Sequence, residues 1–212
     1  MEYLDILSLT AIATTIGMFL CGIPICQTIS SRGSTDGISA APFILGTIGC
    51  VFWLRYGLLK DDSTIQVVNA IGLFLEIIYL GFYWIYSKSK VTISRQILFI
   101  GILSVAMLGY LHLYDELPDV ALEHLGVMCM TLNILNFGAP LAGVRDVFRS
   151  GSTENLPFPL CFTNLLVSSQ WFTYGIMTDD FYIKLPNSIG IFLALMQLSL
   201  FVIYPRRRVH LG

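Results

Sequence analysis

Two stretches of the chain, 118 positions apart, decide how it folds. Residues 53–72 read WLRYGLLKDDSTIQVVNAIG, and residues 171–190 read WFTYGIMTDDFYIKLPNSIG. Both contain a Trp, a Tyr-Gly pair, an Asp-Asp pair, an Asn and an Ile-Gly pair at the same spacing. The match continues without a gap over residues 33–86 and 151–204, where 17 of 54 positions are identical. The sequence therefore contains a tandem repeat, since apolar composition alone does not reproduce matched Trp, Asn and Asp-Asp residues.

The composition indicates a membrane protein. Of the 212 residues, 55% are hydrophobic and 12% are charged, and the mean hydropathy is +0.74. Soluble domains carry about 25% charged residues, so this chain has too few to cover a water-facing surface. The net charge of −2 gives no overall attraction to nucleic acid. We therefore expect the lipid bilayer, and no nucleic acid, among its partners.

Seven apolar segments are long enough to cross a bilayer, whose core of about 30 Å needs roughly 20 helical residues. They must be helical, because lipid offers no partner for an unpaired backbone N–H or C=O. The segments are residues 6–30, 39–59, 65–87, 96–114, 121–147, 157–177 and 182–204. The predicted fold class is an all-α membrane protein with seven transmembrane helices.

The repeat divides these helices into three, one and three. Upstream of the main match, an offset of 116 pairs Gly22 with Gly138 and Pro24 with Pro140, so each repeat includes the helix before it. Three helices per repeat is an odd number, and one extra helix between them makes the two repeats parallel, a layout found in transporters. We predict a first repeat at 1–87, a linker helix within 88–118, a second repeat at 119–205 and a basic tail at 206–212.

The basic residues predict the orientation. Loops one, three and five and the C-terminus hold nine bases, whereas the even-numbered loops hold two, Lys60 and Lys184; the fourth loop is acidic, with Asp115 and Glu116. We expect the N-terminus outside and the C-terminus in the cytoplasm. The N-terminal Met-Glu-Tyr-Leu-Asp lacks the basic region of a cleaved signal peptide, so we expect the first segment to remain as a helix.

Several segments carry a family resemblance. They are PFILGTIGCVFWLRYGLLK at 42–60, LPFPLCFTNLLVSSQWFTYG at 156–175, Val67-Val68-Asn69 and Leu185-Pro186-Asn187. With the repeat, they make the chain resemble the SWEET sugar transporters, and the animal members most closely. The resemblance implies facilitated, bidirectional transport of a mono- or disaccharide, such as a glucose-like sugar, by alternating access. It implies no cofactor and no metal.

The resemblance also implies roles for particular residues. Sugar binding falls on the paired asparagines Asn69 and Asn187, with the paired aromatics Trp53 and Trp171. The outer gate falls on Tyr56 and Asp180. The prolines near the inner helix ends, which would close the inner gate, are Pro24, Pro42, Pro140 and Pro157. At cavity positions of the first and fifth helices this chain has Gly17 and Leu20 against Asn133 and Asn136, which leaves the preferred sugar open.

The chemistry of the residues supports these roles but leaves alternatives. An uncharged amide both donates and accepts hydrogen bonds, as sugar hydroxyls do, and two related amides suit opposite edges of one ring. Asparagines also link membrane helices, and Asn133 and Asn136 fit packing equally well. A Trp face suits the apolar side of a sugar, although Trp is also common at the membrane interface. The prolines are compatible with hinges or with static kinks.

Glu76 is an acid well inside a predicted span, seven residues after Asn69. An intramembrane acid is a functional candidate, and proton coupling is one interpretation. Its repeat partner is Ala194, so we favour a protonated or hydrogen-bonded structural acid.

Other functions fit less well. A carrier related to the PQ-loop proteins, moving an amino acid, would call for charged groups at its centre, and the chain has no Pro-Gln dipeptide. A seven-helix receptor does not need the repeat. The sequence shows no enzyme motif with a nucleophile and base or a metal-ligand set. Self-association, the plasma membrane and the Golgi all remain compatible with the sequence.

Overall fold

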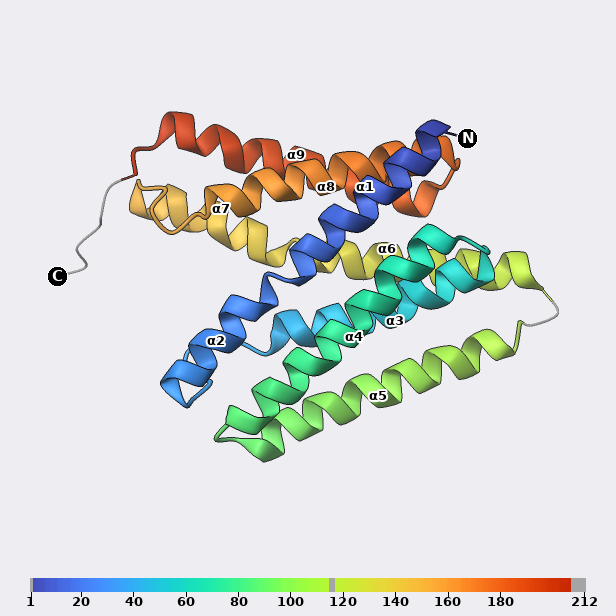
Figure 1. Cartoon of the computed structure of the whole chain (residues 1–212), viewed down its shortest axis with the longest axis horizontal. Coiled ribbons are helices and arrows are strands. Elements are labelled where there is room, and N and C mark those ends of the chain that lie inside the picture. The colour runs from blue at the N-terminus through green and yellow to red at the C-terminus, as the bar shows by residue number, and fades with distance from the viewer. Residues whose placement is uncertain (1, 115–116, 207–212) are drawn as a thin grey trace. The chain divides into compact units, whose positions relative to one another are not determined.

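The computed structural model describes residues 2–114 and 117–206. The described part contains nine α-helices (Figure 1). Their bounds are α1 (Glu2–Phe19), α2 (Gly22–Arg32), α3 (Ala41–Leu59), α4 (Ser63–Tyr86), α5 (Lys90–His112), α6 (Pro118–Asn136), α7 (Gly138–Ser150), α8 (Phe158–Met177) and α9 (Phe181–Ile203). Asp115 and Glu116 of the acidic fourth loop and the basic tail from Arg207 onward lie outside the described residues, and the predicted domain boundaries and orientation stay predictions.

The nine helices make the seven predicted spans. Six continuous or broken helices in the described part are long and apolar enough to cross a membrane, and two of them are composite: Glu2–Arg32 joins α1 to α2, and Pro118–Ser150 joins α6 to α7. The seventh span is α8, which has 20 residues but is less apolar because it contains Asn164, Ser168 and Gln170.

Prolines explain the two broken spans. Pro24 has no backbone N–H to donate to the carbonyl of Leu20, and its ring crowds the preceding turn. The Ile23 N–H donates to Leu20 O at 3.0 Å instead, and α1 ends at Phe19. In the fifth span Pro140 follows the break at Phe137. Pro24 and Pro140 thus lie at breaks in their spans, and their role as hinges of an inner gate stays a prediction.

The prolines of the second and sixth spans lie at helix starts and not at breaks. Pro42 lies in the first turn of α3, and Pro157 is the N-cap residue of α8. A helix needs no N–H at its first positions, so proline is well accommodated there. These two residues start helices and do not bend them internally.

The chain forms two compact units that cut across the sequence repeats. One contains residues 15–129, and the other contains residues 2–14 and 130–206 of the described chain. Both boundaries fall within the first span of a repeat, and Thr14 aligns with Met130 by the 116-residue offset. In the second unit the Thr14 hydroxyl donates to Gln170 Oε1 at 2.6 Å, which joins α1 to α8.

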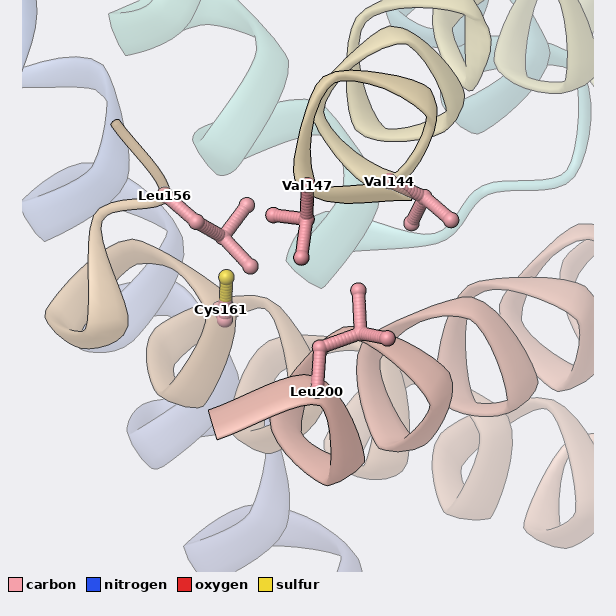
Figure 2. Packing of buried hydrophobic residues seen from close by; sticks show 5 residues of the cluster. All are labelled: Val144, Val147, Leu156, Cys161 and Leu200. Carbon is pink, nitrogen blue, oxygen red and sulfur yellow. The ribbon is translucent and has the colours of Figure 1, made fainter. Parts of the chain in front are cut away.

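Within each unit, the second and third helices of a repeat pack along their lengths: α3 against α4, and α8 against α9. A buried cluster closes one end of the second unit around α7, α8 and α9 (Figure 2). Its members are Val144, Val147, Leu156, Cys161 and Leu200. The cluster ties the short helix after the break to the helix pair that follows it.

Candidate functional site

The third helix of each repeat is anchored in the same way. The Asp62 carboxylate accepts a hydrogen bond from Ile65 N at 3.0 Å at the start of α4. The Asp180 carboxylate accepts from Tyr182 N at 2.9 Å and Ile183 N at 3.2 Å at the start of α9. These N-caps fix where each helix begins. They place the predicted sugar-binding asparagine seven residues later, about 10 Å along the helix.

The two asparagines have the same local geometry. Asn69 Nδ2 donates to Ile65 O at 2.8 Å, and Asn187 Nδ2 donates to Ile183 O at 2.8 Å. Both side chains are half-buried. An amide has two N–H donors and a carbonyl oxygen, so this bond holds the side chain while leaving the remaining groups for a ligand. Because each bond stays within its own helix, it does not link neighbouring helices.

The paired aromatics also repeat in detail. The Trp53 and Tyr56 rings on α3 are 5.3 Å apart at 76°, and the Trp171 and Tyr174 rings on α8 are 5.4 Å apart at 71°. Both indoles are half-buried. The buried tyrosine in each pair meets its indole edge-on, an arrangement that aromatic rings favour. Each tyrosine therefore orients a flat apolar indole surface nearly two turns before its helix ends.

The Tyr-Gly and Asp-Asp pairs build a tight corner between the second and third helices. Asp62 N donates to Gly57 O at 2.9 Å, and Asp180 N donates to Gly175 O at 2.8 Å. Asp61 and Asp179 have φ of 54° and 50°, in the left-handed region. A β-carbon at Gly57 would lie 3.0 Å from Ile65 Cγ2. The repeated glycine and Asp-Asp pair are therefore explained by the backbone geometry of this corner.

The two residues predicted to form the outer gate, Tyr56 and Asp180, belong to these corners. Asp180 is 3% exposed and caps α9, while Tyr56 is 1% exposed. Both have a structural task in their own repeat, and their joint role as an outer gate stays a prediction.

A contact that the sequence did not predict joins the asparagine helix to the break in the first span. A β-carbon at Gly72 would lie 2.5 Å from Phe19 Cζ and 2.9 Å from Cys50 Sγ. Gly72 is one turn after Asn69, and Phe19 is the last residue of α1. Only glycine lets this ring lie directly against α4.

The second repeat has a looser version of this packing of a phenylalanine ring against a glycine, which we call a phenylalanine socket. A β-carbon at Gly190 would lie 2.6 Å from Ser168 Oγ and 3.7 Å from Phe137 Cε1. Phe19 and Phe137 are 118 positions apart, so extending the main offset upstream is the signal that would have found the pair. The sockets link the candidate sugar-binding helices to the two breaks.

A second bond supports each broken span. The Tyr79 hydroxyl donates to Phe19 O at 3.1 Å, a carbonyl left without its usual partner because Ile23 N bonds to Leu20 O. At the equivalent position in α9, Gln197 Nε2 donates to Pro140 O at 3.2 Å. The sequence concealed this equivalence because the two donors are of different residue types.

Comparison with known proteins assigns the family. The family model described as "Sugar efflux transporter for intercellular exchange" matches residues 5–91 and 123–209, once for each repeat. The chain belongs to this family. The SWEET family resemblance seen in the sequence is thereby confirmed, as are the tandem repeat and the fold class.

Relatives in the SWEET family cover nearly all of the chain. The protein named "Sugar transporter SWEET1" of Caenorhabditis elegans is 48% identical over 96% of this chain and 67% of its own length. Its namesake in Drosophila pseudoobscura pseudoobscura is 39% identical over 96% of this chain and 90% of its own. A solved structure of a eukaryotic SWEET transporter matches with a TM-score of 0.85 at 26% identity, over 95% of this chain and 96% of that one.

The asparagines of the fifth span lie just before its break. Asn133 is half-buried and Asn136, the last residue of α6, is exposed. Their position beside Phe137 brings polar groups to the break of the second repeat. Their part in sugar binding stays a prediction.

Proposed function

We propose that this integral, multi-pass SWEET protein is a facilitative, bidirectional sugar transporter. Like the other members of its family, it is a carrier and not an enzyme. The observation that supports the substrate class best is the duplicated asparagine, held by the same 2.8 Å bond to its own helix in both repeats.

We propose that Asn69 and Asn187 bind the same sugar. Uncharged amides match hydroxyl groups without the desolvation cost of a charge. A sugar analogue that lacks the matching hydroxyl leaves an amide unpaired in a low-dielectric site, which disfavours its binding. Trp53 and Trp171, oriented by their tyrosines, supply the apolar surface for the ring. A mono- or disaccharide of glucose-like shape fits these requirements.

We further propose that transport proceeds by alternating access, with the two broken spans as its moving parts. Pro24 and Pro140 remove backbone hydrogen bonds at the breaks, which lowers the energy of bending there. Pro42 and Pro157, at helix starts, define where the second and sixth spans enter the inner face. Tyr56 and Asp180 are assigned to the outer gate.

The distribution of bases supports an N-terminus outside and a C-terminus in the cytoplasm. We propose the boundaries 1–87, 88–118 and 119–205 for the two repeats and the linker helix, with 206–212 as a cytoplasmic tail. The plasma membrane, the Golgi or both are the proposed locations. A homo-oligomer is compatible with so short a chain.

The test is transport by the purified protein in liposomes. Labelled glucose is expected to enter empty vesicles, to leave preloaded ones, and to reach equal concentration on both sides without a proton gradient. A panel of sugars ranks the substrates, and an amino-acid competitor serves as the control. Absence of flux for every sugar, or competition by the amino acid, would contradict the proposal.

A further inference from the structure

Glu76 is a buried acid that the proposed transport mechanism does not use. It lies in the middle of α4 with 9% of its surface exposed, and its Oε2 atom has no hydrogen-bond partner among the described residues. Gly46 of α3 faces the carboxyl group so closely that any β-carbon there would overlap it. The acid therefore fills a space on the seam between α3 and α4 that glycine leaves open.

The surroundings of this carboxyl group are uncharged. Among the described residues, the titratable groups that interact with it are the Cys26 thiol of α2, the Cys50 thiol of α3 and the Tyr79 hydroxyl of α4. None of them is a cation at neutral pH. An unpaired carboxylate in an apolar interior costs several kcal/mol, so the neutral, protonated form suits this place.

In the second repeat, the aligned positions carry a different pair of residue types. Gly46 corresponds to Asn164 on α8, and Glu76 corresponds to Ala194 on α9. Asn164 is half-buried, while Ala194 is 1% exposed. In the first repeat the third helix carries the polar side chain and the second helix the small residue. In the second repeat these assignments are reversed.

We propose that each repeat needs one uncharged polar group on this seam, supplied by protonated Glu76 in the first repeat and by Asn164 in the second. Glu76 is then a positioning residue and does not carry protons through the transport cycle. The inference rests on the proposed sugar transport, because its functional readout is sugar flux.

The position of Glu76 explains what it would hold in place. It lies one turn after Gly72, which contacts Phe19, and one turn before Tyr79, whose hydroxyl bonds to Phe19 O. Both contacts reach the end of α1 at the break. A polar group that fixes α4 against α3 between them keeps both contacts aligned. Its loss is therefore expected to slow the conformational step more than to weaken sugar binding.

Single substitutions separate charge from polarity. Glu76→Gln keeps the size and polarity but cannot ionise, and it should transport within about twofold of the wild type from about pH 5 to 8. Glu76→Ala removes the polar group and should lower the maximal rate by about fivefold or more, with little change in KM. Gly46→Asn alone should also lower the rate, because its side chain meets Glu76.

The decisive variant transfers the arrangement of the second repeat into the first. Gly46→Asn combined with Glu76→Ala should recover transport to within about twofold to threefold of the wild type, so the two changes should be strongly non-additive. The matched control is Gly49→Asn combined with Glu76→Ala. A side chain at Gly49 enters open space on α3, so this pair should not recover.

Thermal unfolding of the same purified variants, measured without sugar, tests the inference independently of transport. Both single changes should lower the unfolding temperature, and the Gly46→Asn/Glu76→Ala pair should restore it. The inference is overturned if Glu76→Gln loses transport or changes its pH profile, if Glu76→Ala behaves as wild type, or if the transferred pair is no better than its worse single change. If the wild-type protein showed no sugar flux but the variants showed the expected unfolding temperatures, the proposed function would be contradicted and the inference about the seam would stand.

Discussion

The asparagines of the third helices combine a fixed side chain with unused hydrogen-bonding groups. In each, one N–H of the amide bonds to the carbonyl four residues earlier. This bond limits the rotation of the side chain, so little conformational entropy is lost when a ligand binds. A pre-oriented amide in each repeat is what a site for one neutral, polyhydroxylated molecule requires.

Removing either amide should impair transport. We expect Asn69→Ala and Asn187→Ala each to reduce sugar flux by about tenfold or more, because a lost hydrogen bond to a buried sugar hydroxyl costs about 1–3 kcal/mol. The measurement is glucose exchange in liposomes at matched protein content. Asn155→Ala, at an exposed loop position, is the control and should transport normally. Normal flux in both helix variants would rule out the amide site.

The two phenylalanine sockets allow one substitution to be compared at equivalent positions. Gly72→Ala brings a methyl group to 2.5 Å from the Phe19 ring, whereas at Gly190 the ring of Phe137 is 3.7 Å away and the near atom is the Ser168 hydroxyl. We expect Gly72→Ala to lower thermal stability and transport clearly, as overpacking typically costs about 1–3 kcal/mol. Gly190→Ala should have less effect, because Ser168 can change rotamer. Equal effects at both sites would contradict the difference in packing.

The exposed ion pair between Asp36 and Lys88 is expected to have no influence on the pH dependence of sugar flux. The hydrogen bond from Lys88 holds the pKa of Asp36 below its ordinary value of 3.8. A lowered pKa in the folded state adds stability above the unfolded value, and this is lost only as the pH falls through the folded value. Both side chains are largely exposed, so the pair is weak. Lys88→Met should therefore leave flux and its pH profile unchanged between about pH 5 and 8. A profile that shifts in this variant would show that the pair contributes to transport.

At the scale of the helices, the sequence predicted the spans but not where they break. Six of the seven segments form helices long and apolar enough to cross a membrane, and the remaining segment forms the less apolar helix α8. Pro24 and Pro140 lie just after the breaks in the first and fifth spans, where each proline lacks the N–H for a helical bond. Pro42 and Pro157 looked equivalent, yet they stand at helix starts. Helix boundaries depend on capping and turn geometry, which residue type alone does not determine.

The break in the first span leads to a test of its role. Pro24→Ala restores an N–H that can bond to Leu20 O and should favour a straighter helix. We expect a maximal transport rate lowered by about fivefold or more with KM nearly unchanged, since the substitution affects the conformational step. Pro118→Ala, in the first turn of α6, is the control. A change confined to KM would indicate that Pro24 acts on sugar binding.

The candidate site was predicted in part for a related reason. Asn69, Asn187, Trp53 and Trp171 were identifiable because both copies kept the same residue. The bonds from Tyr79 and Gln197 were not, because two different side chains donate hydrogen bonds at equivalent positions. A repeat comparison detects identity, whereas packing depends on which pair of residues fills a given space.

At the scale of the whole molecule, the two repeats share the same structural features, although some of these features are formed by different residues. Each repeat has an N-capped third helix, an asparagine seven residues later, an oriented Trp and a Phe against glycine at the break. The compact units do not follow the repeats, since each takes in part of the first span of the other. Changes near either break are therefore expected to affect transport in both directions.

Equilibrium binding of labelled sugar to the purified protein tests the central claim most directly. If Asn69 and Asn187 hold the same molecule, the wild type should bind one sugar per chain, and either Asn→Ala change alone should abolish most of that binding. Two sugars bound per chain, with each single variant retaining one full-affinity site, would contradict the account.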